Sequence, residues 1–326
     1  MKAAVRDRYG PPTVVAVEDV EQPNPGDNDV LVRVRAASVN RADLDGLYPR
    51  WAFVRLFAGF RAPRTRALGS DVAGVVEAVG SDVTRFRPGD EVMGDLFQFG
   101  AGAFAEYVCA PERAFSPLPV GMSFDEAATL PHSAVLALQG LRLGDGRSVG
   151  PGNRVLIVGA SGNVGPFAVQ IAKSRGAMVT GICSTDKVDF VRALGADDVV
   201  DYRIVDYLRG GERYDWILDV EARDSILRWR RLLQPGGAYV ALGGPASTML
   251  FGALGGLVLS RSGDRWMGVM YWWKPFAPDD VATLKELIAA GKVAPAIDRR
   301  FPLSETVAAL QHVDDGHARG KVVITM

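Results

Sequence analysis

Residues 154–202, RVLIVGASGNVGPFAVQIAKSRGAMVTGICSTDKVDFVRALGADDVVDY, decide the fold of this chain. The apolar run at 155–158 predicts a short strand, and residues 166–175 have the pattern of a helix. A second apolar run at 178–183 predicts another strand. A glycine-rich turn joins the first strand to the helix, and in this context such a turn indicates a dinucleotide-binding site.

The glycines of this turn have separate roles. Gly159 and Gly162 allow a tight turn and a close approach of the backbone to a pyrophosphate, and Gly165 lets the helix pack against the strand. The start of the helix then presents unpaired N–H groups to the phosphates. A purely structural turn is the alternative. The residues expected to contact the cofactor here are Gly159, Ser161, Gly162, Asn163, Val164 and Gly165.

The end of the second predicted strand bears on the choice of nucleotide. An acidic residue normally binds the ribose 2′-hydroxyl of NAD at this place, but here Cys183 precedes Ser184, Thr185, Asp186 and Lys187. Two hydroxyls and an ammonium suit a 2′-phosphate, and one charge-assisted hydrogen bond contributes roughly 1.5–3 kcal/mol. The segment therefore favours NADPH through Ser184, Thr185 and Lys187. Asp186 weakens this interpretation, and a solvated loop is the alternative.

Length and charge limit the possible classes of protein. A chain of 326 residues exceeds what one hydrophobic core usually serves, so two domains are expected. The formal net charge of −1 gives no reason to expect nucleic acid or an anionic membrane as a partner. The two cysteines, Cys109 and Cys183, lie far apart, which predicts no disulfide framework and a cytoplasmic setting. Charges in the first ten residues disfavour a signal peptide there.

The longest uncharged stretch, residues 239–260, contains Pro245 and many glycines, which disfavours a membrane span. Its central part, 249–259, is expected to be buried or to pack at a subunit interface or pocket wall.

Strand and helix patterns divide the chain near residue 120. Before it, residues 30–36, 72–79 and 91–93 predict strands. After it, helical and strand patterns alternate, as in a doubly wound α/β domain. Gly243 follows one of these strands, at the sheet edge where a cofactor would lie. Helices are predicted at 125–143, 225–233, 279–290 and 304–314, and further strands at 214–220, 237–242 and 321–325.

Several motifs, in order, resemble the medium-chain dehydrogenase/reductase superfamily, and within it the zinc-independent quinone oxidoreductase-like branch. The resemblance implies an α/β fold: a GroES-like β domain, residues 1–120 completed by 275–326, plus a doubly wound Rossmann domain, residues 121–274. The motifs are VLVRVRAASVNRADL (30–44), LGSDVAGVVEAVG (68–80), RFRPGDEVMG (85–94), GAFAEYVCAP (102–111), AATLPHSAVLALQGL (127–141) and ARGKVVI (318–324).

The same resemblance predicts that no zinc is bound. Zinc-type relatives have a cysteine where Asn40 stands, and Gly-His-Glu where this chain has Gly69-Ser70-Asp71. Structural zinc sites need four ligands, usually thiolates or imidazoles, and two isolated cysteines cannot supply them. No histidine lies near Asn40 or Asp71 in the sequence.

Without a metal, the resemblance implies hydride transfer from NADPH to a quinone or an α,β-unsaturated carbonyl compound. Hydrogen-bond donors at the acceptor oxygen can replace the Lewis acid in such a reaction. Asn40 and Tyr48 are the predicted catalytic residues; the alternatives are a loop residue that bonds its own backbone for Asn40 and simple packing for Tyr48.

The resemblance also assigns residues to the cofactor and to the substrate. Tyr202 and Lys321 are expected beside the cofactor, with a solvated strand-edge lysine as the alternative for Lys321. His132 stands where relatives usually have a small or apolar residue. The alternative for Asp71 is a buried, hydrogen-bonded structural acid. The alternative for His132 is a helix-end residue whose hydrogen bonds are satisfied within the protein. The predicted substrate-pocket residues are Trp51, Asp71, His132, Leu136 and Trp272.

Two departures from the family pattern leave other functions open. Leu136 replaces the threonine of the usual Leu-Thr-Ala, and residues 218–222 lack the usual glycine after the fourth Rossmann strand. One alternative is a biosynthetic enzyme of the same fold that acts on one bulky intermediate, possibly by a non-redox step. Another is a non-catalytic nucleotide- or RNA-binding protein, which the near-neutral charge disfavours for RNA. The resemblance favours a homodimer through an edge strand at 269–272.

Overall fold

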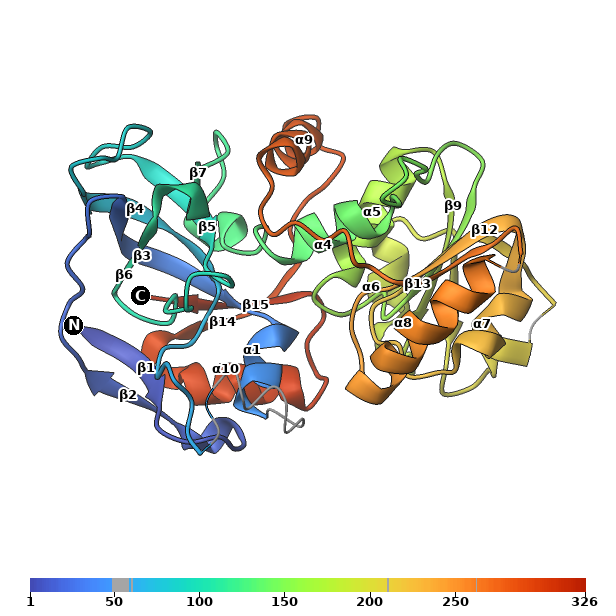
Figure 1. Ribbon diagram of the computed structural model, residues 1–326, viewed down its shortest axis with the longest axis horizontal. Helices are drawn as coiled ribbons and strands as arrows, with labels where there is room; N and C mark the ends of the chain where they lie inside the picture. The colour runs from blue at the N-terminus through green and yellow to red at the C-terminus, as the bar shows by residue number, and fades with distance from the viewer. Residues whose placement is uncertain (49–58, 60, 210, 262) are drawn as a thin grey trace. The chain divides into compact units, whose positions relative to one another are not determined.

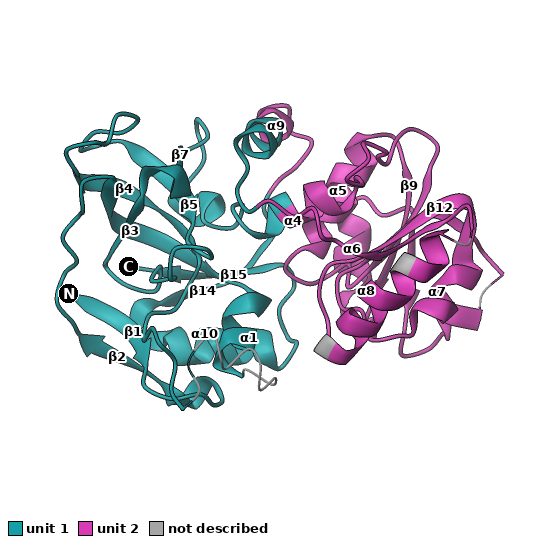
Figure 2. Cartoon of the chain, in the orientation of Figure 1, with its two compact units in different colours: residues 1–135, 275–285, 295–326 teal, residues 136–274, 286–294 magenta. Residues whose placement is uncertain are grey.

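The computed structural model divides the chain into two compact units (Figure 2). Unit 1 comprises residues 1–135, 275–285 and 295–326, and unit 2 comprises residues 136–274 and 286–294. The first boundary between the units lies after residue 135, whereas the sequence predicted a domain boundary after residue 120. The reason is that the helix that begins at Phe124 packs on strands of unit 1. The structure describes residues 1–48, 59, 61–209, 211–261 and 263–326.

Unit 1 is built on a seven-stranded sheet in which β3 is central (Figure 1). β3 pairs antiparallel with β4, β6 and β15, so the last strand of the chain lies beside one of the first. A separate hairpin joins β1 and β2. The strands are β1 (Lys2–Arg6), β2 (Val15–Asp19), β3 (Asp29–Val39), β4 (Asp71–Val79), β5 (Glu91–Asp95), β6 (Tyr107–Pro111), β7 (Phe115–Pro117), β14 (Ile297–Pro302) and β15 (Lys321–Thr325).

The strand register of unit 1 places polar residues side by side. Ser38 of β3 lies opposite Asp71 of β4, and Asp71 lies opposite Asp95 of β5. Helices and apolar side chains of the sheet enclose this end, with Leu44 and Phe104 fully buried in the core. The helices are α1 (Arg41–Leu47), α3 (Phe124–Ala127), α4 (Ser133–Gly140, which continues into unit 2), α9 (Pro278–Ala289, also shared) and α10 (Thr306–Asp314), with 3-10 turns η1 (Pro12–Val14), η2 (Glu112–Ala114) and η5 (Leu303–Glu305).

Unit 2 is a six-stranded parallel sheet in the order β10-β9-β8-β11-β12-β13, with helices on both faces (Figure 1). The chain reverses direction across the sheet between β8 and β11, the switch point where such folds bind nucleotides. Its elements are β8 (Arg154–Val158), α5 (Gly165–Ser174), β9 (Met178–Cys183), η3 (Thr185–Lys187), α6 (Val188–Ala193), β10 (Asp198–Asp201), η4 (Tyr207–Arg209), β11 (Tyr214–Asp219), α7 (Ile226–Leu232), β12 (Leu233–Ala241), α8 (Ala246–Arg261) and β13 (Trp266–Val269).

The predicted α/β class, a β domain plus a doubly wound domain, is confirmed. One expected element differs: the helix predicted at 125–143 is two helices, α3 and α4. Pro131 lies between them, and a proline lacks the N–H that a continuous helix needs. Both cysteines are free. None of the described helices combines the length and apolar character needed to cross a membrane.

The turn after β8 requires glycine at two places. Gly159 has a φ of +78°, a conformation that L side chains rarely adopt. At Gly165 a Cβ atom would lie 2.2 Å from the carbonyl oxygen of Gly159, so only glycine allows α5 to start this close to the strand. At Gly162 a Cβ would meet that oxygen at 3.5 Å, an ordinary contact. The turn itself therefore requires Gly159 and Gly165, whereas the approach of a pyrophosphate to Gly159 and Gly162 stays a prediction.

Candidate active site

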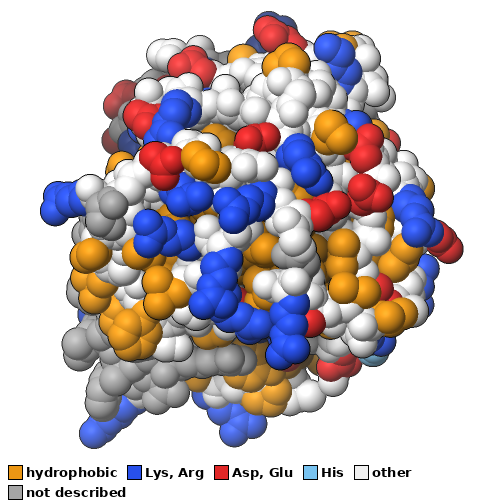
Figure 3. Space-filling view, turned by 90° about the vertical axis from the view of Figure 1, so that its right-hand side faces the viewer, with side chains coloured by type: hydrophobic (Ala, Val, Ile, Leu, Met, Phe, Trp, Pro, Cys, Tyr) orange, Lys and Arg blue, Asp and Glu red, His pale blue; other side chains and the backbone are white. Residues whose placement is uncertain are grey.

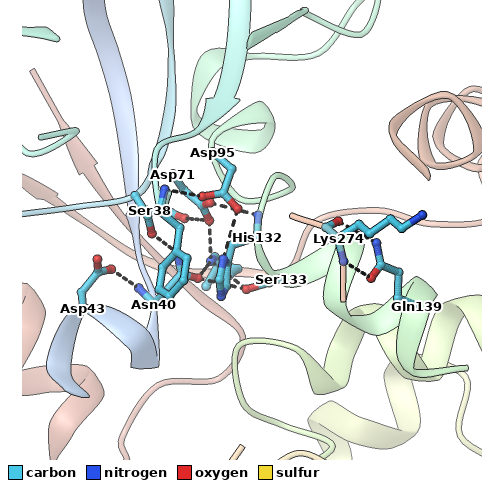
Figure 4. Close-up of polar contacts among 12 residues, drawn as sticks. Ser38, Asn40, Asp43, Asp71, Asp95, His132, Ser133, Gln139 and Lys274 are labelled. Atoms are coloured by element: carbon cyan, nitrogen blue, oxygen red, sulfur yellow. Dashed lines mark hydrogen bonds and ion pairs between the residues drawn. The ribbon is translucent and has the colours of Figure 1, made fainter. Parts of the chain in front are cut away.

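Asn40, Asp71 and Ser133 belong to a polar cluster in unit 1 (Figure 4), and one fully buried ammonium group binds all three. Lys321, the first residue of β15, is 1% exposed. Its Nζ donates hydrogen bonds to Oδ1 of Asn40 at 2.6 Å, Oγ of Ser133 at 3.0 Å and Oδ2 of Asp71 at 3.2 Å. These bonds use all three protons of the ammonium. The alternative of a solvated strand-edge lysine is therefore wrong, and a contact of Lys321 with the cofactor stays a prediction.

Asp71 provides the counter-charge. Its carboxylate is 0% exposed, and it also accepts bonds from Oγ of Ser38 at 3.0 Å and from the backbone N–H of His132 at 3.0 Å. Burial lowers the pKa of Lys321 and raises the pKa of Asp71, while the attraction between the two opposes both shifts. Asp71 was predicted to line a substrate pocket; its burial and its partners place it inside the cluster.

The side-chain amide of Asn40 is held in one orientation. Its Oδ1 accepts from Lys321 and from Oγ of Ser133, the latter at 3.1 Å, and its Nδ2 donates to Oγ of Ser70 at 3.3 Å. Because a cation binds the amide oxygen, the amide is polarised and its N–H groups become stronger donors. Asn40 precedes α1, and its backbone N–H donates to Oδ2 of Asp43 at 2.8 Å.

Asp43 is a second buried carboxyl beside Asn40. Burial raises the pKa of Asp43 to about 7, although its bond from the Asn40 backbone N–H opposes the shift. The cluster thus contains groups of both signs whose titration depends on one another.

A histidine–aspartate pair borders the same cluster (Figure 4). Nδ1 of His132 lies 3.2 Å from Oδ2 of Asp95, the last residue of β5. The other carboxylate oxygen of Asp95 accepts from the backbone N–H of Phe97 at 2.8 Å. Burial by itself lowers the pKa of His132, but Asp95 and then Asp71 raise it, and the net shift is upward from 6.5.

The strand register explains why Asp71 and Asp95 each have a basic partner. Asp71 and Asp95 are directly opposite on neighbouring strands, an arrangement that is destabilising for two bare carboxylates. Lys321 supplies one compensating positive group, and His132 supplies a second when it is protonated. Asp95 is not predictable as a site residue from the sequence, because only the pairing of β4 with β5 brings it beside Asp71.

Of the predicted site residues Tyr48 and Trp51, the structure describes only Tyr48. Tyr48 directly follows α1, and its hydroxyl donates to Oδ2 of Asp314 at 3.0 Å, so this phenol proton is engaged within unit 1. The prediction of Tyr48 as a proton donor therefore finds no support in this geometry. Trp51 lies outside the residues that the structure describes.

The predicted cofactor residues of unit 2 gather at the carboxyl edge of its sheet. The glycine turn follows β8, Ser184 follows β9, Tyr202 follows β10 and Gly243 comes soon after β12. Because these strands are parallel, their carboxyl ends meet at one edge. In the turn, Ser161, Val164 and Gly165 are buried, and Gly162 and Asn163 are half-buried.

The residues near the expected ribose have mixed charges. Oγ of Ser184 donates to Oδ1 of Asp186 at 2.7 Å, which lowers the pKa of Asp186. Thr185 is exposed, Lys187 is largely buried in η3, and the ring of Tyr202 is exposed. A carboxylate therefore stands beside the cation that was predicted to bind a 2′-phosphate.

The remaining predicted pocket residues of unit 2 are packed within it. Leu136 is half-buried on α4. Nε1 of Trp272 donates to the backbone oxygen of Gln139 at 3.3 Å, and the indole lies edge-on to Trp266. Gln139 binds both backbone groups of Lys274, at 2.8 and 3.0 Å (Figure 4). Packing within unit 2 accounts for these contacts of Trp272.

An aspartate fixes the turn that lacks the family glycine. Ala222 has a φ of +33°, and its N–H donates to Oδ1 of Asp219 at 2.7 Å. The hydroxyl of Tyr239 donates to the other oxygen at 2.9 Å. Burial raises the pKa of Asp219 to about 6. The carboxyl of Asp219 therefore holds, at the cofactor edge, a conformation that normally requires glycine.

Comparison with known proteins defines the class. The family model of the alcohol dehydrogenase GroES-like domain matches residues 26–120, and that of the zinc-binding dehydrogenases matches residues 194–324. The human mitochondrial NAD(P)H oxidoreductase RTN4IP1 is 35% identical, over 100% of this chain and 89% of its own. The tomato (Solanum lycopersicum) 2-methylene-furan-3-one reductase is 30% identical, over 99% of this chain and 79% of its own.

A solved structure agrees with these sequence relatives. The quinone oxidoreductase from Coxiella burnetii superposes with a TM-score of 0.88 at 30% identity, covering 100% of this chain and 99% of that one. The chain belongs to the medium-chain dehydrogenase/reductase superfamily, in its quinone oxidoreductase-like branch. It is an oxidoreductase that uses a nicotinamide cofactor, as the resemblance predicted.

The residues around Asn40 do not fit a zinc ion. An amide, the Ser70 hydroxyl and an ammonium replace the thiolate and imidazole ligands that zinc prefers, and Lys321 would repel a divalent cation. Among the described residues, no group of three or more histidine, cysteine, aspartate or glutamate side chains could hold a metal. The glycine turn of unit 2, by contrast, has the sequence and the place after β8 that are typical of a dinucleotide site.

Lys321→Met is expected to lower the free energy of unfolding by about 3–5 kcal/mol, because it leaves the Asp71 carboxylate buried without its cation. Adding Asp71→Asn should recover part of this loss. Urea unfolding followed by circular dichroism measures both variants. Lys2→Met, which breaks a pair whose side chains are 58% and 79% exposed, is the control and should change little. An equal loss in the free energy of unfolding for Lys321→Met and Lys2→Met would contradict a stabilising pair of buried charges.

Proposed function

We propose that this protein is an NADPH-dependent, zinc-independent reductase of quinones or α,β-unsaturated carbonyl compounds. The observation that carries the proposal is the fixed orientation of the Asn40 amide. Its oxygen accepts a hydrogen bond from the Lys321 ammonium, and its nitrogen, which donates to Oγ of Ser70, is the hydrogen-bond donor that we assign to the acceptor oxygen. When bound, the reduced nicotinamide supplies a hydride. An acceptor of this class then develops negative charge on its oxygen, and a polarised N–H group stabilises that charge.

The acceptor class is supported by two relatives. One is named for the reduction of a 2-methylene-furan-3-one, which is an α,β-unsaturated ketone, and the other is a quinone oxidoreductase. In both kinds of acceptor, hydride adds at carbon and the charge moves to a conjugated oxygen. A single oriented donor such as Asn40 serves either one.

Asn40→Asp tests the donor directly. The variant keeps an oxygen for Lys321 and Ser133 but loses the amide N–H groups, so kcat with a vinyl ketone or a para-quinone should fall about 10²- to 10³-fold. The Kd for NADPH should not change. Asn28→Asp, at an exposed position of unit 1, is the matched control. Wild-type protein that oxidises no NADPH with any acceptor of these classes would refute the proposal, and an unimpaired Asn40→Asp would refute the role of the amide.

We propose NADPH as the preferred cofactor, with Lys187 as the residue that favours it. Lys187→Ala is expected to raise the Kd for NADPH about ten- to a hundredfold, the value of one charge-assisted bond, and to leave NADH binding nearly unchanged. Calorimetric titration of the purified protein with each cofactor measures this. Lys292→Ala, at an exposed position of unit 2, is the control. Tighter binding of NADH by the wild type would show that Asp186 rather than Lys187 sets the preference.

We also propose that a second copy of the chain covers one face of unit 2. β13 is the edge strand of the sheet, and α8 packs beside it. The edge strand ends at Val269, earlier than the predicted 269–272. Figure 3 shows hydrophobic and basic side chains on the surface of unit 2. Four apolar side chains of α8, at helical spacing, are more than half exposed. These side chains are Leu250, Phe251, Leu254 and Val258.

Pairing of two β13 edges around a twofold axis would bury this apolar face and leave no open strand edge there. Light scattering should therefore give twice the chain mass of 35.0 kDa. Leu254→Glu should shift the protein towards monomer, whereas Leu227→Glu, an exposed leucine on α7, should not. A wild-type monomer at micromolar concentration would contradict the dimer.

A further inference from the structure

We infer that Asp219 is a positioning residue for the nicotinamide cofactor, because it fixes the turn at residues 220–222 against the glycine turn that follows β8. The inference rests on the proposed function, in which the cofactor binds at this edge of unit 2. Asp219 is the last residue of β11, and β11 pairs with β8. The turn at 220–222 therefore lies at the switch point of the sheet, where folds of this kind bind nucleotides.

The carboxylate of Asp219 is 0% exposed, and both of its oxygens have partners. Oδ1 accepts the backbone N–H of Ala222 at 2.7 Å and that of Glu221 at 3.2 Å. Oδ2 accepts the hydroxyl of Tyr239 at 2.9 Å. The ring of Tyr239 stacks on that of Trp229 with 5.7 Å between centroids, which fixes the hydroxyl in turn. Asp219 thus connects the backbone of the turn to the packed interior of unit 2.

The charge of Asp219 strengthens this hold on the turn. Burial raises the pKa of Asp219 to about 6, while the bonds from Ala222 and Tyr239 oppose the shift, so the carboxylate form prevails at neutral pH. Hydrogen bonds to an ionised acceptor are roughly twice as strong as those between neutral groups. They hold Ala222 at a φ of +33°, in a region that residues with a side chain rarely adopt.

The turn that Asp219 holds packs against two glycine segments of the cofactor edge. A Cβ atom at Gly159 would lie 3.3 Å from Cγ of Glu221 and 3.5 Å from Cβ of Val220, so these two side chains cover Gly159. On the other side, a Cβ atom at Gly244 would lie 2.6 Å from the carbonyl oxygen of Glu221. A displacement of the turn would therefore disturb the segments after both β8 and β12.

A turn that is fixed in advance favours cofactor binding. If residues 220–222 were free to move, the cofactor would have to order them, and the cost of that ordering would weaken its affinity. The bonds to Asp219 supply this order before the cofactor binds. Because Asp219 is fully buried, it acts through the turn and not by touching the cofactor.

Asp219→Ala tests the inference by calorimetric titration with NADPH. The variant loses all three bonds to the carboxylate, so the Kd for NADPH should rise about 10- to 100-fold. The matched control is Asp215→Ala, near the amino end of the same strand, where Oδ2 of Asp215 accepts the backbone N–H of Arg154 at 2.8 Å. This control should bind NADPH as tightly as the wild type, even if its free energy of unfolding falls.

A second substitution separates positioning of the turn from general stability. Glycine adopts a positive φ without steric cost, so Ala222→Gly should restore much of the affinity that Asp219→Ala loses. In the wild-type background, Ala222→Gly should leave the Kd nearly unchanged. The effects of the two substitutions on the Kd should therefore be non-additive. Additive effects would overturn the inference.

The remaining outcomes distinguish the inference from the proposed function. A wild-type Kd in Asp219→Ala would overturn the inference and leave the reductase function standing. If circular dichroism shows that Asp219→Ala does not fold, Asp219→Asn replaces it. That variant keeps an oxygen for the N–H groups but loses the charge, so its Kd should rise about fivefold, and an unchanged Kd would overturn the inference. A wild-type protein that binds neither NADPH nor NADH would overturn both.

Discussion

The buried ion pair of Lys321 and Asp71 is the interaction on which the polar cluster of unit 1 depends. A pair of this kind adds little net stability, because each ion loses its water on folding. It does define geometry, since each charge must keep all of its partners. Lys321 can satisfy its ammonium only if Asn40 turns its oxygen inwards and Ser133 approaches with its hydroxyl. The orientation of the amide that we assign to oxygen binding is thus a consequence of satisfying a buried cation.

Chain topology brings this pair together. β15 is the last strand of the chain, yet it pairs with β3, and that pairing places Lys321 beside Asn40. The β3–β4–β5 register then aligns Ser38, Asp71 and Asp95 across three strands. The electrostatic consequence is a small charge-balanced core, with His132 at its border. This arrangement gives the chain an oriented amide beside a buried ion pair.

The sequence predicted local features well and the cluster poorly. Residues 154–202 specify a strand, a turn and a helix through short-range rules, so the doubly wound unit and its glycine turn could be predicted without tertiary information. Asn40 and His132 were singled out as separate candidates, and Lys321 was assigned to the cofactor. The contact between Asn40 and Lys321 joins residues 281 positions apart in the sequence, and it depends on a strand register that no local pattern encodes. No sequence pattern indicated Asp95 as a site residue, because its place in the cluster follows only from lying opposite Asp71.

We propose above that oriented hydrogen-bond donors at Asn40 take the place of a metal ion. The most direct test combines a metal analysis by mass spectrometry with the rate of enone reduction before and after exhaustive chelation. We expect far less than one zinc per chain, full activity after chelation and no response to added zinc. One zinc per chain, with activity that chelation removes and zinc restores, would contradict it.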